Sequence, residues 1–388
     1  MPSGRLTAHA RSFLEQRFAR KPDGSYFPHQ PLHGLYGESE AGRPLRLARS
    51  YRLLRWIEAL APQSLADLGA AEGYIANLVR LRQGCPTLCI DLSLEACRRA
   101  AEIHGQPAVA SPLQSIPLPD DSVDVVLLSE VFEHLEDPLQ VVREMVRVAR
   151  RYVVITTQEI CMSRAEQSIR LQLRDLDEAH GELNWLCSAD LHSLFSGPSR
   201  SAPQFRRSLR RLAGQVSREE AISHLRWLAD AVPRRSEGII FVASLDGNPV
   251  PELPAGDDMQ LWQQLVEGPQ RAPAGNAQWQ LADGRSVEEG QALDSGTSPE
   301  QALSSETEAR PPLDAEGIRR LMLRLDTSNV TRSGTERRLL SKLVRMMERI
   351  GYLTCTDPWA VRSNWLRSRL GPAAREKVPN PDPEASSG

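Results

Sequence analysis

Short apolar runs alternate with amphipathic stretches over residues 64–157. The runs have the length of buried strands, and the stretches between them repeat apolar positions at helical spacing. The predicted strands are Leu65–Leu68, Thr87–Ile90, Pro107–Ala110, Val123–Leu128 and Tyr152–Thr157, with a later one at Gly238–Leu245. Strands that alternate with helices predict an α/β fold with a doubly wound, mostly parallel sheet.

The predicted helices fill the gaps between these strands. Tyr74–Leu81 and Ser93–His104 follow the first two strands, and Ser93 is a favourable N-cap. A third helix begins at Asp137-Pro138, where a capping acid precedes a proline, and runs to about residue 149.

Beyond residue 157 the periodicity weakens. The sequence predicts helices at Glu166–Asp177, Ser188–Phe195 and Glu219–Ala231. A further strand has no clear signal, so it is either hidden near Gln204–Leu212 or absent.

Composition divides the chain into segments. We predict a helical and looped lead-in over 1–60, a main domain over 61–249 with an insertion at about 196–236, an acidic disordered linker over 250–312, a basic helical segment over 313–370 and a polar tail over 371–388. The linker prediction follows from its prolines, glycines, serines and acids and from its lost apolar periodicity. Within it, Met259–Val266 is a candidate short helix. The basic segment carries amphipathic helices at Ile318–Leu325 and Glu336–Ile350, which predicts docking on the main domain or on a protein partner.

The lead-in is predicted to hold helices at Ala8–Arg20 and Leu45–Leu60. Between them, rings and histidines crowd among glycines and prolines: Tyr26, Phe27, His29, His33 and Tyr36. This cluster either lines a substrate pocket or forms a packed loop.

The stretch from Ser64 to Asp91 has the order strand, glycine turn, helix, strand, acid. Open α/β sheets hold nucleoside-bearing cofactors with such a unit. A dinucleotide fold would show G-x-G-x-x-G, whereas here Gly69 and Gly73 are spaced G-x-x-x-G. Asp67 would repel a pyrophosphate but suits a cationic amino-acid group, and Asp91 suits the two hydroxyls of a ribose. S-adenosylmethionine fits this pattern better than NAD.

The same stretch resembles the class I S-adenosylmethionine-dependent methyltransferases, of the group sometimes called type 11. Their acid-x-G-x-G-x-G motif is matched from Asp67 to Gly73, with Ala71 in place of the middle glycine. Their later block is matched from Ile116-Pro117 through SEVFEHLEDP, which contains Glu133-His134. The resemblance implies a Rossmann-like methyltransferase fold over about residues 50–195 and the strand at 238–245. The cofactor-binding residues that it implies are Asp67, Gly69, Ala70, Ala71, Gly73, Asp91, Leu92, Ser111, Gln114, Ser129 and Glu130.

The chain departs from the family after the third strand. The family usually has an acid there that accepts from the adenine amino group. Here the segment reads Ser111-Pro112-Leu113-Gln114, so Ser111 or Gln114 would serve instead.

Methyl transfer to a hydroxyl calls for a base, and histidine suits a pH near neutrality. His134, just past the fourth strand, and His180, in HGELNW, are the candidates. Helix capping or packing is the alternative role for each. A metal site at His134 with Glu130 and Glu133 lacks a third ligand at sensible spacing, so we predict no metal.

The net charge, the length of the apolar runs and the cysteine content exclude some classes of function. The net charge of −3 over 388 residues does not indicate polyanion binding, so nucleic acid is not the expected partner. No run approaches the ~20 apolar residues of a membrane span, the N-terminus lacks a signal-peptide core, and six scattered cysteines indicate reduced thiols in the cytoplasm. The leading hypothesis is a methyltransferase acting at an oxygen of a small-molecule or glycan-type acceptor. A non-catalytic binding or scaffold protein of the same fold is the alternative, followed by an RNA methyltransferase that uses the basic C-terminal helices.

Overall fold

The computed structural model describes most of the chain. The described residues are 4–36, 43–158, 160–161, 163–173, 178–206, 216–231, 236–275, 277–304, 313–325 and 342. The helix predicted over 336–350, apart from residue 342, the tail over 371–388 and most of the arginine cluster at 206–211 lie outside them.

Among the described residues, the central sheet has eight strands in the order β10-β3-β2-β1-β4-β5-β7-β6. Their bounds are β1 Leu65–Leu68, β2 Thr87–Asp91, β3 Ala108–Ala110, β4 Val123–Ser129, β5 Ala149–Thr157, β6 Ser199–Arg206, β7 Ser236–Ser244 and β10 Ala292–Asp294. Pairing is parallel from β10 to β5, and β7 runs antiparallel to both β5 and β6. The predicted doubly wound, mostly parallel sheet is confirmed. The strand order reverses between β1 and β4, where open α/β sheets bind their ligands.

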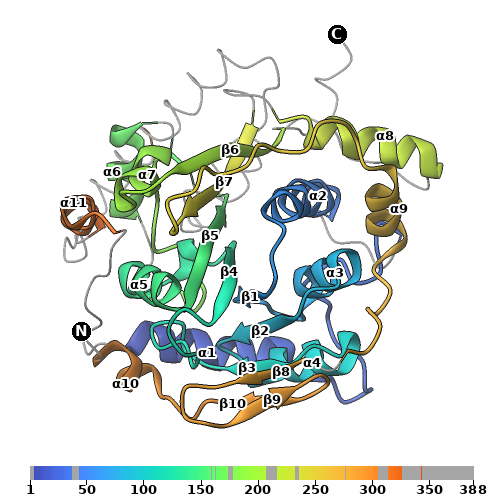
Figure 1. The fold of residues 1–388 in the computed structure, drawn as a ribbon, viewed down its shortest axis with the longest axis horizontal. Coiled ribbons are helices and arrows are strands. Elements are labelled where there is room, and N and C mark those ends of the chain that lie inside the picture. Colours follow the sequence, from blue (N-terminus) through green and yellow to red (C-terminus); the bar gives the residue numbers. More distant parts are fainter. Residues whose placement is uncertain are drawn as a thin grey trace.

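Helices cover both faces of the sheet (Figure 1). Their bounds are α1 Arg5–Phe18, α2 Arg43–Leu60, α3 Tyr74–Gln83, α4 Leu94–His104, α5 Pro138–Val148, α6 Arg164–Leu173, α7 Ser188–Leu194, α8 Arg218–Ala229, α9 Met259–Glu267, α10 Pro299–Ser304 and α11 Ala315–Leu325, with a 3-10 turn η1 at Phe132–His134. One large buried cluster joins α2, α3, α8 and α9 to the sheet, and the other joins α5, α7 and α11 to it.

The predicted helix starts have the expected caps. The Ser93 hydroxyl accepts from the Ala96 amide at the start of α4. The Asp137 carboxylate accepts from the Gln140 amide, with Pro138 in the first turn of α5. These local signals are the reason that the two helices begin where the sequence predicts.

Strand β6 needs a correction. The sequence offered 204–212 or no strand, whereas β6 spans Ser199–Arg206 and pairs antiparallel with β7. It is an edge strand that contains Pro203 and buries only Gln204 and Phe205. An edge strand that is half exposed and interrupted by proline has no continuous apolar run for a sequence pattern to detect.

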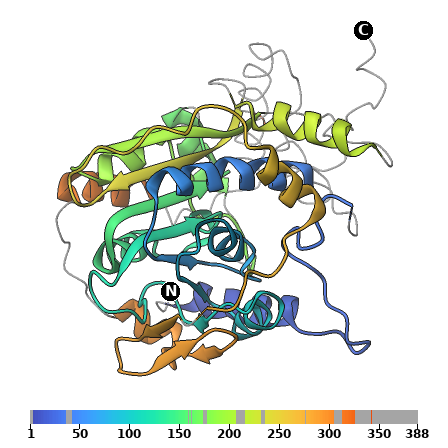
Figure 2. The same cartoon turned by 45° about the vertical axis from the view of Figure 1, so that its right-hand side comes forward.

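The disordered linker predicted over 250–312 also needs a correction. In place of a linker, its described residues form α9, a β8–β9 hairpin (Gln278–Gln280 and Ser286–Glu288), β10 and α10. The candidate helix at 259–266 is present as α9. The segment passes from α9 beside α2 to the β3 edge of the sheet, and both views show its two ends far apart in the molecule (Figures 1 and 2).

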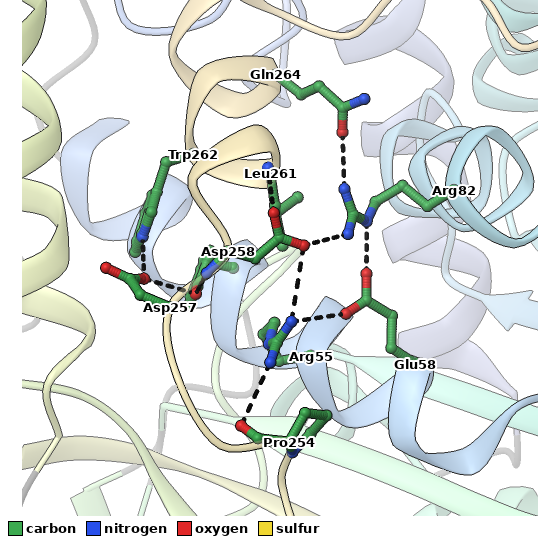
Figure 3. A network of polar contacts seen from close by, with 10 residues as sticks. Arg55, Glu58, Arg82, Pro254, Asp257, Asp258, Leu261, Trp262 and Gln264 are labelled. Atoms are coloured by element: carbon green, nitrogen blue, oxygen red, sulfur yellow. Dashed lines mark hydrogen bonds and ion pairs between the residues drawn. The ribbon is translucent and has the colours of Figure 1, made fainter.

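A polar network holds α9 in place (Figure 3). Asp258 caps α9 through the Leu261 amide and pairs with Arg82 of α3 and Arg55 of α2. On the neighbouring turn, the Trp262 ring stacks on Tyr51 at 3.7 Å between centroids. Because Trp262 is fully buried, the segment is part of the core rather than a tether.

The described part of the basic C-terminal segment is α11, which packs on the main domain. Ile318 and Leu321 are buried in the same cluster as α5 and α7, and the Asp314 amide donates to the Leu194 carbonyl. Within the described ranges, no helix combines the length and apolar composition that crossing a bilayer requires.

Candidate functional site

The glycine turn after β1 has a left-handed backbone and no room for side chains. Gly69 has φ +68°, and a Cβ there would lie 2.3 Å from Cγ2 of Val131. Gly73 has φ +74°, and its Cβ would lie 3.0 Å from that of Ala100. The Gly69 amide donates to the Ile90 carbonyl at 2.7 Å. Glycine at both positions therefore lets the turn lie against β2 and the loop after β4.

Asp91, the last residue of β2, stabilises this turn by hydrogen bonding. Its carboxylate accepts from the Ala71 amide at 2.8 Å and from the Ser93 amide at 2.9 Å. Burial, more than the nearby charge of Glu15, raises the pKa of Asp91 to about 6. Ala71 takes φ +49°, an uncommon conformation for a residue with a side chain. The hydrogen bond from the Ala71 amide to the Asp91 carboxylate holds Ala71 in this strained conformation.

Asp67 lies beneath the turn. Its side chain is buried, 3% exposed. Burial first, then repulsion from Asp91, raises the pKa of Asp67 to about 7. The sequence placed Asp67 against a cationic group of the cofactor, whereas the structure places its carboxyl outside the cavity lining.

A cavity opens at the carboxyl ends of β1, β2 and β4. Its lining residues are Thr7, Ala10, Leu14, Phe18, His29, Gly69, Ala71, Asp91, Leu92, Leu113, Gln114, Glu130, Val131, His134, Leu135, Glu136 and His180. Its position is the switch point of the strand order, as the α/β rule predicts. Of the cofactor residues predicted from sequence, Gly69, Ala71, Asp91, Leu92, Gln114 and Glu130 line it.

The segment after β3 supplies one end of the cavity. Gln114 and Leu113 line it, as does Leu92 after β2. Ser111 does not, because its hydroxyl donates to the Ser115 carbonyl at 3.1 Å and its side chain is buried. Of the two residues predicted to replace the adenine-binding acid, Gln114 is therefore the better placed.

The end of β4 supplies the other end. Glu130 has φ +59° and lines the cavity. Its carboxylate accepts from Thr156, Gln204 and Arg49, the last at 3.0 Å. The Ser129 hydroxyl instead shares a hydrogen bond with Thr156 and lies outside the lining. Glu130 is thus the charged group that β4 presents to the cavity.

Two predicted histidines meet on the cavity wall. The rings of His134 and His180 stack with centroids 4.0 Å apart. Nδ1 of His134 lies 3.0 Å from the Gly181 carbonyl oxygen. Because a carbonyl only accepts, Nδ1 carries a proton there, and whenever the ring is neutral the lone pair is on Nε2.

The segment HGELNW fixes this arrangement. Asn184 donates to the carbonyls of Phe132 and Leu135, and the amides of Leu183 and Asn184 donate to the Glu133 carbonyl. Burial, followed by repulsion from His134, lowers the pKa of His180 to about 2. His180 therefore stays uncharged near neutral pH.

The ring and histidine cluster of the lead-in was predicted either to line a substrate pocket or to form a packed loop, and the structure places His29 on the cavity wall. The loop is locked to the glycine turn from both sides. Glu72 accepts from the amides of His29 and Gln30, and the Gln30 side chain contacts the Ala70 carbonyl and the Tyr74 amide. Burial, followed by the charge of Arg46, lowers the pKa of His29 to about 3.

Helix α1, in the lead-in, covers the cavity and contributes Thr7, Ala10, Leu14 and Phe18 to its lining. Glu136 accepts from the amides of Gly4 and Thr7 at its first turn. Glu15, near its end, accepts from the Leu94 and Glu95 amides at the start of α4. Glu136 belongs to SEVFEHLEDP, but neither that block nor the sequence around Glu15 indicates these partners, because each carboxylate acts on a helix terminus distant in the chain.

The residues present fit S-adenosylmethionine. A Cβ would fill the cradle at Gly69, Asp91 retains acceptor capacity beyond its backbone donors, and Glu130 offers a charge at the far end. These features suit an adenosine moiety followed by a charged amino-acid tail. Among the described residues, no group of three or more His, Cys, Asp or Glu is arranged to hold a metal ion.

Comparison with known proteins agrees with this fit. Residues 66–155 match the sequence model of a family described as a methyltransferase domain, which confirms the resemblance seen in the sequence. An uncharacterized methyltransferase of Mycobacterium ulcerans (strain Agy99) is 34% identical over 96 residues, which cover 24% of this chain and 37% of the relative. A probable S-adenosylmethionine-dependent methyltransferase of Mycobacterium tuberculosis (strain ATCC 25618 / H37Rv) is 36% identical over 100 residues, 24% of this chain and 35% of the relative. The chain thus spans little more than a third of the length of these relatives.

Solved structures cover a larger part of the chain at lower identity. A SAM-dependent methyltransferase from Archaeoglobus fulgidus is 17% identical, covering 52% of this chain and 94% of that chain with a TM-score of 0.35. The YcgJ protein from Bacillus subtilis is 15% identical, covering 50% of this chain and 97% of that chain with a TM-score of 0.37.

Proposed function

We propose that this protein moves a methyl group from S-adenosylmethionine to an oxygen of a small-molecule or glycan-type acceptor, because residues 66–155 match the sequence model of a methyltransferase domain. The observation that carries the proposal is one cavity that joins the Gly69 turn and Asp91 to the imidazole of His134. Cys85, Cys89 and Cys97 are free and buried thiols, which supports a reducing, cytoplasmic setting.

The cofactor would be held along the carboxyl edge of the sheet. Asp91 would accept from the ribose hydroxyls, Leu92 and Gln114 would flank the base, and Gly69 would let the backbone approach closely. When bound, the cofactor supplies a methyl carbon on a positively charged sulfur together with its own leaving group. The protein is left with positioning the acceptor and receiving its proton.

His134 is the residue proposed to receive that proton. The Gly181 carbonyl fixes its tautomer, so that Nε2 has the lone pair that an acceptor hydroxyl can protonate. His180, with its lowered pKa, is a poor competitor for the proton and instead packs against the ring of His134. The apolar lining of Leu14, Phe18 and Leu135 excludes water from the acceptor.

Calorimetry with S-adenosylhomocysteine tests the cofactor site. We expect the wild type to bind and Asp91→Ala to lose about 10- to 100-fold in affinity, because charge-assisted hydrogen bonds to the ribose are lost. A folded wild type that does not bind would remove the proposal.

Turnover separates an enzyme from a binding or scaffold protein. Incubation with S-adenosylmethionine and a fractionated small-molecule extract should release S-adenosylhomocysteine. His134→Gln should slow release by about 100-fold or more while leaving S-adenosylhomocysteine affinity unchanged. Binding without any turnover would favour the scaffold alternative.

A further inference from the structure

The imidazole ring of His29 lines the cavity without making a hydrogen bond. His29 lies in the loop between α1 and α2. Within the described part of the chain neither of its ring nitrogens has a hydrogen-bond partner, and Nδ1 is buried. Because Nδ1 is shielded from solvent, Nε2 is the nitrogen that a ligand can reach. Ligand cavities typically combine an apolar lining with a few such polar groups in fixed positions.

The backbone of His29 is fixed on both sides of the ring. Its amide donates to the Glu72 carboxylate at 3.0 Å, and its carbonyl accepts from Arg46. Glu72 pairs in turn with Arg99 at 2.8 Å, and these two side chains are 0% and 4% exposed. The ring of Phe18, on α1, packs edge-on against the His29 ring with centroids 5.6 Å apart. The ring is therefore held in place by its surroundings, which lowers the entropy that a ligand would lose by ordering it.

The surroundings also keep the His29 ring uncharged. Burial first, and then the positive charges of three arginines, lower the pKa of His29 to about 3. A neutral imidazole has one N–H donor and one lone pair, so it can pair with a hydroxyl or carbonyl group without a proton transfer. Near neutral pH the ring is thus a hydrogen-bonding group and a poor base.

His29 lies at the same end of the cavity as the two stacked histidines. Burial is the main cause of the lowered pKa of His29 and of His180, and repulsion from His134 adds to both. His29 itself also lowers the pKa of His180. Because repulsion between charges decreases with distance, these mutual effects place the three rings near one another. A ligand that meets His134 is therefore within the part of the cavity that His29 lines.

We propose that His29 determines acceptor specificity: Nε2 of its ring forms a hydrogen bond with a second oxygen of the acceptor, beside the hydroxyl that His134 deprotonates. This inference rests on the proposed function, and it narrows the acceptor to a compound with two neighbouring oxygens on an apolar body. The apolar body matches Leu14, Phe18 and Leu135, which line the cavity. A sugar would leave several hydroxyls without partners against these side chains, which costs free energy.

Two matched probes test this assignment by NMR titration of the full chain in complex with S-adenosylhomocysteine. Salicyl alcohol carries two neighbouring hydroxyl groups on a benzene ring, and benzyl alcohol lacks the second. We expect the wild type to bind salicyl alcohol about 3- to 10-fold more tightly, the contribution of one hydrogen bond. His29→Phe, which keeps a ring against Phe18, should abolish this difference and change S-adenosylhomocysteine affinity by less than about twofold. His29→Gln, which keeps a hydrogen-bonding group, should retain part of the difference.

The matched control is His33→Phe, because His33 lies in the same loop but is exposed and outside the cavity lining. It should leave the affinities for both probes unchanged. Equal binding of the two probes by the wild type, or an undiminished difference in His29→Phe, would overturn the assignment while leaving the proposed function intact. A His29→Phe variant that lost S-adenosylhomocysteine affinity instead would place the ring against the cofactor and also overturn it. Failure of the folded wild type to bind S-adenosylhomocysteine would remove the proposed function itself.

Discussion

The strands and helices of residues 64–157 and the segment of residues 250–304 reach the same core by different routes. In the first region each element carries its own apolar period, and α4 and α5 carry their own caps. In the second, α9 buries Leu261, Trp262, Leu265 and Val266 together, but beyond α9 side chains such as Trp279 and Val287 are buried singly between polar turns. Local sequence thus specifies the first region, whereas contacts distant in the chain specify the second.

This difference has a physical cause. A buried parallel strand is apolar on both faces, so its run is visible in the sequence. A segment that crosses the outside of a formed domain needs few anchors, because the surface beneath it supplies the rest of the apolar contact. A composition rich in proline, glycine and acids is therefore compatible with such an ordered segment as well as with disorder.

The largest effect is expected for Trp262→Ala, which tests whether the segment 250–304 is part of the core. The ring is fully buried and stacked on Tyr51, so its loss should lower the free energy of unfolding by about 3–5 kcal/mol. Urea unfolding followed by far-UV circular dichroism measures it. Met259→Ala, on an exposed side chain of the same helix, should stay within about 0.5 kcal/mol of wild type. An unchanged midpoint for Trp262→Ala would mean that α9 is a tether.

Substitution of a glycine by alanine should reduce S-adenosylhomocysteine affinity in the first region but not in the second. Gly69→Ala forces a Cβ to within 2.3 Å of Val131, and the displaced turn should cost about 100-fold in S-adenosylhomocysteine affinity, or about 2.7 kcal/mol. Gly284→Ala has a positive φ but no atom within 4 Å, so it should cost about 1 kcal/mol of stability and no affinity. Calorimetry on both variants decides the matter. Equal affinities would show that the turn adapts freely.

The buried acid of the first region should give stability a pH dependence. Because the pKa of folded Asp67 is raised from 3.8 to about 7, the folded state retains the proton more strongly than the unfolded state. This carboxyl therefore lowers the free energy of unfolding as pH rises from about 4 to 7, with no further change above. Asp67→Asn should flatten that slope and stabilise the protein by about 2 kcal/mol at pH 8. Urea midpoints at pH 5 and pH 8 test it, and parallel shifts in both proteins would contradict the assignment.

The smallest expected effect lies in the network of Figure 3. The side chains of Arg82 and Asp258 are 14% and 18% exposed, so solvent screens their attraction in part. A double-mutant cycle of Arg82→Gln and Asp258→Asn should give a coupling of about 0.5–1 kcal/mol, decreasing in 1 M salt. A coupling that is zero at low salt would leave the docking of α9 to its apolar face alone.

The sequence predicted the cavity residues at the strand ends better than those on α1, α2 and the loop between these helices. Gly69, Asp91, Glu130 and His134 each follow the carboxyl end of a strand, and parallel strands bring those ends together at one edge. The sequence could not show that Ser111 faces its own backbone or that Asp67 lies beneath the turn, since both depend on side-chain direction within a few ångströms.

The missed residues share one property. Arg49, Glu15, Gln30 and Glu136 act on groups between 40 and 132 residues away in the chain. Only Glu136 lies in a motif, SEVFEHLEDP, and that motif does not indicate its partner. A single charge or amide elsewhere in a helix or loop is usually interpreted as solvated surface. Only the folded arrangement of α1, α2 and the loop between them over the sheet assigns their partners.

The pairing of β10 with β3 bears on how the chain behaves in crowded solution. Without β10, the backbone groups of β3 would form an open edge that a second molecule could extend. Three residues of the segment 250–304 occupy that edge, while Pro203 removes one backbone donor from β6 at the opposite edge. A chain that ended at residue 249 would keep strands β1 to β7, but β3 would become an exposed edge strand with unpaired backbone groups. The segment therefore also protects the sheet against self-association.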